Sequence, residues 1–554
     1  MNNEKGSSLL LVMLVTLVFM VLGLSIITAS VGGAKRTQLR NTDVVSTQDS
    51  VNTIEQVIAE FRVEMLNQTK YPLDERQIPD FNLKLAQFIT ALEAKYSITI
   101  ESLTETGQPY DYIETSKYFT RVYKLTVDNG DKFVHQTLIL SPTPSFIEYA
   151  AGSIGKDSNQ GLHLNGSSYI NGNVYANDIY LQNVANYKDN AFSSTGNAPG
   201  SFQTAATLFP SIKGNMYVQR YWNVTDRNKP HPITNANFED LEEKEEMFYK
   251  NELPSIKNEP KDFIDVDFRK SFAERLNQLL PSRIIGKENI PALTDEDKDE
   301  KLDKLILDNF SNSAATPEEL KSKLRQQDGE KYVLYDNNLT VTENINIPED
   351  KWLIVHGNVT VFPFDKGDNP LTIEGNMLVT GDFTIAGNEE EVNQDEDDIV
   401  AFDSTIYALG KSTIHNTNIE GYNEKQLVLL SFDKLTVTRI NEFTEIESDT
   451  LSNITPLKAF FYTDSEAELY GVGSLFYIHG GLFARDNLVI NATRSNTTKL
   501  ENKIISVPSP ELQEHAPSRF NVMYDKDVLT DQLDALPRVE RLQVVTDNLY
   551  IQAK

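Results

Sequence analysis

The chain has 554 residues, of which 40% are hydrophobic, and a formal net charge of −30 at pH 7. This length predicts roughly three or four domains with sizeable cores. The acidic balance excludes phosphate-backbone binding to nucleic acid, or docking on anionic lipid, by the bulk of the chain. The sequence contains no cysteine, so disulfides, thiolate metal sites and cysteine nucleophiles are also excluded.

The first thirty residues predict a membrane anchor. Residues 9–27 are almost entirely aliphatic, and no charge occurs between Lys5 and Lys35. A helix of this run spans about 28 Å, enough for the hydrocarbon core of a bilayer. The main alternative is a secretory signal, but its apolar region is shorter, roughly 7–15 residues. We therefore expect a leader over 1–6 and a transmembrane helix over 7–30.

The residues before the apolar run carry a more specific signal. Glu4, Lys5 and Gly6 are followed at once by Ser7 and the helix. This arrangement resembles a type IV prepilin, and in particular the minor pilins of the PilX kind. The resemblance implies cleavage after Gly6, Ser7 as the first mature residue, and other pilins and the pilus assembly machinery as partners. Leu11 stands at the position where major pilins carry glutamate. The absence of this glutamate resembles a tip or initiating subunit more than a major subunit.

The charges that flank the helix give a contrary signal about orientation. Lys35, Arg36 and Arg40 follow the helix, whereas only Lys5 precedes it. The positive-inside rule alone would place the C-terminal side in the cytoplasm. Long domains translocate with little regard to such charges, and pilin-like proteins use a dedicated assembly route. We therefore expect a single-pass protein of the cell membrane, with its bulk extracytoplasmic at the cell surface.

An amphipathic helical extension is predicted over 31–70, followed by a small α+β domain over 71–145. The extension has one apolar stripe, made of Val51, Ile54, Val57, Ile58, Phe61 and Met65. The domain is predicted to hold a helix over 80–95 and strands over 97–102, 118–127 and 132–140. The turn between the last two contains Asn129-Gly130, a strong hairpin signal.

A six-residue repeat then predicts a parallel β-solenoid over 146–187 and 331–500. The repeat is carried by Asn165, Asn171, Asn177 and Asn183, and again by Gly357, Gly375, Gly381 and Gly387. Short strands between turn residues would stack their apolar side chains in continuous ladders. These stretches resemble bactofilin-like proteins. An antiparallel β-sandwich with Asn-Gly hairpins is the alternative. The overall expectation is an α+β chain that is mostly β.

Residues 188–330 are predicted to form an insertion with helices. One helix is marked by Ile264 to Leu279, a second by residues 302–306, and a third by the N-cap Thr316. Because loops on a solenoid often carry binding residues, this insertion is the expected partner-contacting element. Residues 501–554 are predicted to form a C-terminal cap or tail.

Residues that would carry catalysis are sparse, so we expect no enzyme activity, cofactor or metal. The seven histidines show no metal-ligand spacing, and no P-loop or full dinucleotide motif occurs. His356-Gly357 and His479-Gly480 are superficially similar to the His-Gly of β-helical pectin-cleaving enzymes. The acidic runs over 389–398 and 295–299 are compatible with calcium, but solvated loops are the expected interpretation.

The sequence therefore predicts a membrane-anchored, pilin-like structural or adhesive protein that displays a β-solenoid. Two alternatives stay open. One is an anchored enzyme acting on cell-surface or environmental polysaccharide. The other is a membrane-tethered scaffold that never joins a pilus.

Overall fold

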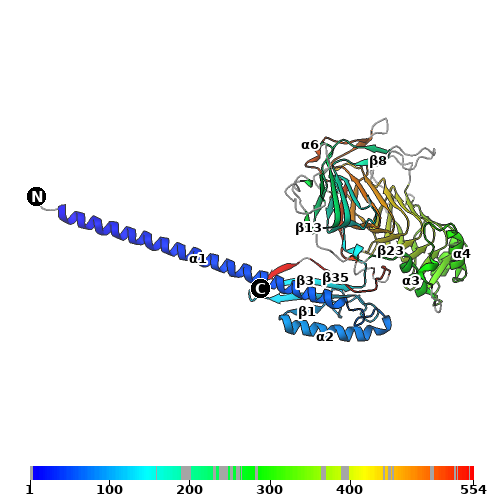
Figure 1. The fold of residues 1–554 in the computed structure, drawn as a ribbon, viewed down its shortest axis with the longest axis horizontal. Helices are drawn as coiled ribbons and strands as arrows, with labels where there is room; N and C mark the ends of the chain where they lie inside the picture. Colours follow the sequence, from blue (N-terminus) through cyan, green and yellow to red (C-terminus); the bar gives the residue numbers. More distant parts are fainter. Residues whose placement is uncertain are drawn as a thin grey trace. The chain divides into compact units, whose positions relative to one another are not determined.

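The computed structural model describes most of the chain (Figure 1). The residues outside this description are 1–3, 158, 189–200, 229–232, 236–246, 250–253, 258–262, 264, 281–284, 364–369, 388–397, 424, 441–442, 447–450, 452–453, 500–504, 529–531, 533–534 and 548. The chain divides into two compact units. Unit 1 comprises residues 1–142 and 540–554, and unit 2 comprises residues 143–539.

Unit 1 begins with one uninterrupted helix, α1 (Glu4–Met65), of 62 residues. No proline interrupts it, and several of its serines and threonines donate their hydroxyls to the carbonyl four residues earlier, as Thr16 does to Val12. The helix therefore joins the predicted transmembrane segment and the predicted extension. It ends at Met65, five residues before the predicted end of the extension.

The C-terminal part of α1 packs on a small antiparallel sheet. The sheet order is β1 (Thr99–Ser102), β2 (Arg121–Asp128), β3 (Lys132–Ser141) and β35 (Gln543–Thr546), with β36 (Tyr550–Ala553) also on β3. The predicted apolar stripe faces this sheet, and Ile54, Val57 and Phe61 are fully buried. The helix α2 (Ile78–Tyr96) shares this core, where Phe88 meets Phe61 edge to face. The predicted helix, strands and Gly130 hairpin are confirmed to within a few residues.

The last strands correct one prediction. Residues 501–554 were expected to cap the solenoid, yet β35 and β36 pair with β3 in unit 1 (Figure 1). Leu542 is buried in the core of unit 1, so these strands complete its hydrophobic core. A third strand of the predicted tail, β34 (Phe520–Tyr524), pairs within the sheet of unit 2. The tail is thus divided between the two units.

Unit 2 is a parallel β-solenoid with three faces. Face 1 contains β15 (Tyr332–Tyr335), β18 (Trp352–Val355), β21 (Asn376–Val379), β23 (Asp398–Ala408), β26 (Leu427–Ser431), β28 (Leu457–Thr463), β30 (Phe476–Ala484), β4 (Ala151–Ser153), β7 (Val174–Gln182), β11 (Asn215–Thr225) and β13 (Ser255–Lys257). Face 2 contains β16 (Leu339–Val341), β19 (Val359–Val361), β22 (Phe383–Ala386), β24 (Ser412–His415), β27 (Leu435–Thr438), β29 (Ala467–Gly471), β31 (Leu488–Ala492), β5 (Leu162–Gly166) and the ends of β7 and β11. Face 3 contains β17 (Ile345–Asn346), β20 (Leu371–Glu374), the start of β23, β25 (Thr417–Gly421), the start of β30, β34, β6 (Tyr169–Asn171) and β10 (Ser211–Lys213).

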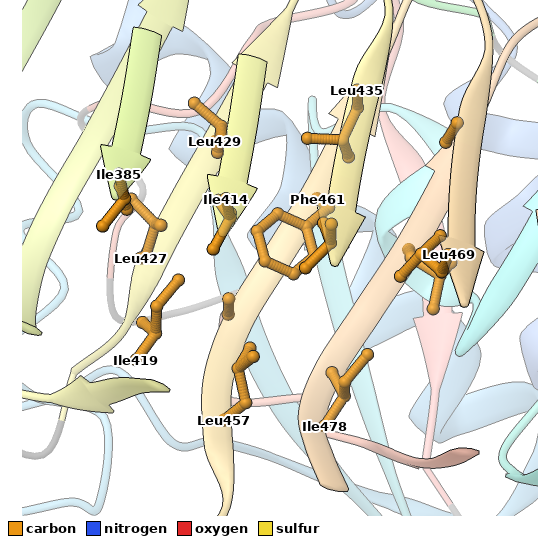
Figure 2. Packing of buried hydrophobic residues seen from close by; sticks show 14 of the residues in the cluster. Ile385, Ile414, Ile419, Leu427, Leu429, Leu435, Leu457, Phe461, Leu469 and Ile478 are labelled. Carbon is orange, nitrogen blue, oxygen red and sulfur yellow. The ribbon is translucent and has the colours of Figure 1, made fainter. Parts of the chain in front are cut away.

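Alternating side chains of these strands fill the solenoid. In Figure 2 the buried Ile385, Ile414, Leu435, Phe461 and Leu469 project from neighbouring strands into one interior. Each parallel pair sets like positions about 4.8 Å apart, so apolar residues stack as ladders. The parallel solenoid is confirmed, and the antiparallel sandwich is wrong for unit 2.

The six-residue spacing marks the corners between faces. Gly375 stands between β20 and β21, and Gly381 between β21 and β22. Gly375 has φ +94°, and a Cβ there would lie 2.4 Å from the carbonyl oxygen of Ile347 in the adjacent coil. Only glycine meets both constraints without strain. The six-residue spacing is therefore the length of one strand together with the corner that follows it.

The coils are not stacked in chain order. Coils from 332–492 run toward the middle of the stack, where β30 and β31 pair with β4 and β5. The strands of 151–225 then continue the stack, and their cyan and teal ribbons lie beside the orange strands in Figure 1. The chain thus enters the solenoid in its interior, winds to one end, crosses to the other end and winds back.

The predicted insertion over 188–330 is therefore smaller than expected. Its first part supplies β10 and β11, which pair in parallel with β6 and β7 and belong to the solenoid. Its second part holds α3 (Phe268–Leu279), α4 (Lys298–Leu307) and α5 (Pro317–Leu324), at the positions the sequence predicts. The Thr316 hydroxyl accepts the amide proton of Glu319, as expected of an N-cap.

Candidate functional sites

The N-terminal half of α1 has apolar side chains with no partner in the described chain. Phe19 is 68% exposed and Ile26 is 69% exposed, and no charged residue occurs between them. By length and composition this is a helix able to cross a bilayer, and it is the one such helix in the described residues. A surface of this kind is unstable in water, because burying apolar area is the dominant favourable term in folding.

The residues of the predicted cleavage site lie in the first turns of this helix. Gly6 and Ser7 are within α1, and Leu11 is 64% exposed one turn further on. Lys35, Arg36 and Arg40 are exposed just beyond the apolar half. The apolar half is thus bounded by Lys5 and this basic cluster, and no structural contact determines which side of a membrane each occupies.

The connection between the units defines how unit 2 is carried. The strands β3 and β35 are antiparallel neighbours, and Ser141 pairs with Gln543 in their register. The whole of residues 143–539 lies between these two strands in the sequence. Unit 2 is therefore an insertion in a β-hairpin of unit 1, joined to it by two chain segments.

The histidines of the two His-Gly pairs have different surroundings. His356 makes structural contacts, and the ring nitrogen Nε2 of His479 has no hydrogen-bond partner in the described chain. His356 Nδ1 lies 2.7 Å from Asp336 Oδ1, and its Nε2 lies 3.0 Å from Asp303 Oδ1. These contacts tie α4 to a corner between face 1 and face 2. His479 Nε2 is buried without a partner in the described chain, and burial lowers its pKa.

One half-buried cluster, of Asp464, Arg485 and Asp265, combines carboxylates with an arginine, as many enzyme active sites do. Both carboxylate oxygens of Asp464 lie 3.0 Å from Arg485 Nη1, and Arg485 Nη2 lies 2.8 Å from Asp265. The Tyr462 hydroxyl donates to Asp464 at 3.1 Å. Burial raises the pKa of Asp464 to about 6, despite the opposing charge of Arg485. The cavities lined by His163, by Asn41, by Val21 and by Pro317 do not include these groups.

The acidic run over 295–299 is partly neutralised, because Lys301 Nζ lies 3.0 Å from Asp295 and 2.8 Å from Asp297. Most of the run over 389–398 lies outside the described residues, and Asp398 begins β23. Within the described part of the chain, no group of three or more acidic or histidine side chains is placed to hold a metal ion.

Face 2 carries a regular outward surface. Successive strands place one threonine at the same outward position, namely Thr340, Thr360, Thr384, Thr413 and Thr436. The same position continues through Glu468, Val489, His163, Tyr180 and Asn223. In the sequence four of these five threonines stand between two apolar residues, but nothing there indicates that His163 continues their row.

Comparison with known proteins gives little further guidance. No protein-family model matches the sequence, and no curated protein matches it. Among solved structures, the competence-associated pilin ComZ from Thermus thermophilus is similar. The alignment covers 80% of this chain and 82% of that chain, with 12% sequence identity and a TM-score of 0.27. A common fold is not demonstrated at this TM-score, so the function has to be inferred from the residues of this chain.

Proposed function

We propose that this chain is a membrane-anchored, pilin-like minor subunit that displays its β-solenoid outside the cytoplasm. The observation that carries the proposal is the division of α1 into two halves. The first half is apolar and exposed on all sides, whereas the second is fastened to a sheet through Ile54, Val57 and Phe61. One half is suited to a lipid or helical filament core, and the other holds the domain that leaves it.

The insertion of unit 2 between β3 and β35 supports a display role. Two covalent connections, at Ser141 and Gln543, join the solenoid to the sheet on which α1 packs. In this proposal unit 1 attaches the solenoid to the membrane helix, and unit 2 carries the surface that is exposed to the environment. We propose that unit 2 is not catalytic, since the half-buried Asp464 is held by an ion pair with Arg485 and a hydrogen bond from Tyr462.

The test is the mature N-terminus of protein taken from native membranes and from sheared surface material. Intact mass and N-terminal peptide mapping should show a start at Ser7, with the processed form enriched in the sheared fraction. The variant Gly6→Leu should keep Met1 and be absent from that fraction. Gly23→Leu is the matched control, because a Cβ at Gly23 meets nothing within 4 Å.

Each other outcome has a definite meaning. An unprocessed Met1 confined to membranes would contradict the pilin mechanism and leave a tethered scaffold. A start near Val31 would show that the helix is removed and the anchor is wrong. Turnover of a polysaccharide by the purified chain would instead favour the anchored enzyme.

A further inference from the structure

A shallow groove runs along face 2 where the two windings of the solenoid meet. It has a volume of about 400 Å³ and spans four adjacent strands, β31, β5, β7 and β11. One wall is the outward row Val489, His163, Tyr180 and Asn223, and the other is the row Asn165, Gln182 and Thr225. The groove adjoins the place where β5, early in the chain, pairs with β31, late in the chain, and β31 contributes Val489 to it.

The first wall presents two stacked rings beside Val489. The rings of His163 and Tyr180 are stacked, with centroids 4.3 Å apart and planes 6° from parallel. His163 Nε2 also lies 3.3 Å from the carbonyl oxygen of Asn159. Burial lowers the pKa of His163, which favours the neutral imidazole. A ligand therefore meets preorganised ring surfaces with little side-chain ordering left to occur.

The second wall presents side-chain amides. Asn165 Nδ2 donates to Asn491 Oδ1 at 3.0 Å, which fixes the row. The side-chain amides of Gln182 and Asn186 make no hydrogen bond to the described residues. Next to this wall, Asn491 Nδ2 is buried and also lacks a partner in the described chain. Each amide both donates and accepts, so the wall suits groups that do the same.

The charge of the groove narrows the ligand class. No lysine, arginine, aspartate or glutamate is among the described residues that line it, in a chain of net charge −30. The nearest carboxylate along the outward row is Glu468, beyond Val489, and Lys434 lies 3.5 Å from it. A charged polymer would have to leave water for a site that offers no opposite charge.

The backbone of the groove argues against a peptide strand. The strands β31, β5 and β7 are each paired on both sides, so they offer no free edge for strand addition. Recognition there must use side chains alone. An uncharged chain of hydroxyl groups, with apolar C–H faces between them, fits amides on one side and rings on the other.

We infer that the groove bounded by His163, Tyr180 and Gln182 binds a linear, uncharged glycan along the solenoid axis. This inference rests on the proposed function, since it names what the displayed solenoid would hold. It assigns binding and no bond cleavage.

The experiment uses the full-length protein in detergent micelles. Cello-, chito-, manno- and xylo-oligosaccharides are the neutral probes, oligogalacturonides are the charged probes, and binding is measured by array and then by calorimetry. We expect at least one neutral probe to bind. Tyr180→Ala and Gln182→Ala should each weaken its Kd roughly tenfold, the size expected for one lost ring contact and for one lost hydrogen bond, respectively, in a desolvated site. Tyr422→Ala is the matched control, because Tyr422 is 37% exposed and is absent from the groove.

Several results would overturn the inference. These are binding of no neutral probe, binding only of oligogalacturonides, and a Kd unchanged by both groove substitutions. Retention of a neutral peptide library that the same substitutions abolish would also overturn it, in favour of a peptide site. An unchanged melting temperature excludes misfolding of Gln182→Ala, whose amide has no described partner. The mature N-terminus is measured separately, so failure of glycan binding is distinct from failure of the pilin mechanism.

Discussion

At the scale of single residues, unit 2 holds buried charges in two contrasting ways. Arg519 is fully buried, and in the described chain its guanidinium meets only backbone carbonyls, those of Thr444, Gly473 and Ser474. Burial lowers its pKa to about 10. Asp464, by contrast, is paired with Arg485 and still has a raised pKa. Arg519 therefore holds together the loops that supply these carbonyls, whereas Asp464 makes the stability of the fold depend on pH.

We expect Arg519→Ala to lower the free energy of unfolding by about 3 kcal/mol, because three buried carbonyls lose their donor and a cavity remains. The free energy of unfolding of Arg519→Lys should lie between those of Arg519→Ala and the wild type, since an ammonium reaches fewer of the carbonyls. Arg325→Ala, at an exposed arginine, should change stability by less than about 0.5 kcal/mol. Denaturant titration in detergent measures all three, and equal losses for Arg519 and Arg325 would contradict the assignment.

Asp464 predicts a pH effect of definite sign. Its pKa is about 6 in the folded chain against an ordinary value of 3.8, so the folded state holds the proton more tightly. Its contribution to stability is therefore present below about pH 4 and is lost as the pH rises to about 6. Asp464→Asn does not titrate, so its melting temperature should rise relative to the wild type over this range. A difference that stays constant with pH would show that the carboxylate is not perturbed.

At the scale of elements, one strand shows the two environments of the solenoid side by side. In β24, Ile414 is fully buried in the interior (Figure 2), whereas the adjacent Thr413 points outward and is half-buried. The same alternation holds along face 2, where each threonine is flanked by buried inward residues, all of them apolar except Ser412. The stability of the fold should therefore depend strongly on the inward positions of each strand and weakly on the outward positions.

We expect Ile414→Ala to lower the free energy of unfolding by about 2–5 kcal/mol, through lost burial and a residual cavity. Thr413→Ala, one residue away, should cost less than about 1 kcal/mol, because it changes only an outward position on a strand. The pair is compared by thermal unfolding followed by circular dichroism. Similar losses for both would mean that the interior is not close-packed at this coil.

The sequence predicted those elements whose determinants are local. Asn129-Gly130 predicted the hairpin between β2 and β3, and Thr316 predicted the start of α5. The spacing of Gly375 and Gly381 predicted the length of the strands and the positions of the corners. It could not predict that β31 pairs with β5, because stacking partners in a solenoid share only a side-chain pattern that every coil satisfies. For the same reason the groove at Tyr180 was missed, since the sequence does not show that Val489 of β31 lies beside His163 of β5.

At the scale of the whole molecule, unit 1 has its own core and its own sheet. All its strands pair with each other, and its core includes Leu542 from the end of the chain. The two connections to unit 2 leave from the paired residues Ser141 and Gln543. Unit 1 should therefore fold when the insertion is removed.

We expect replacement of residues 143–541 by Asn-Gly to give a folded small domain that keeps Leu542, because Asn-Gly is a favoured turn between antiparallel strands. Cooperative thermal unfolding and a mixed helix and strand circular dichroism spectrum in detergent would show it. Adding Leu125→Asp, at a fully buried position of β2, should abolish the transition. A shortened chain that melts without cooperativity would show that unit 1 depends on unit 2.

The coil that begins at residue 151 has its preceding neighbour far away in the sequence, as the bond from Gly161 to Asn487, 326 residues apart, illustrates. During synthesis or export, this coil therefore emerges with one row of backbone amides and carbonyls unsatisfied. The bare edge persists until nearly all of the chain has emerged, and in that interval it is a template for pairing with another copy. Correct assembly therefore depends on timing: the last coils must arrive before a neighbouring chain does, and low local concentration at the export site would protect the fold.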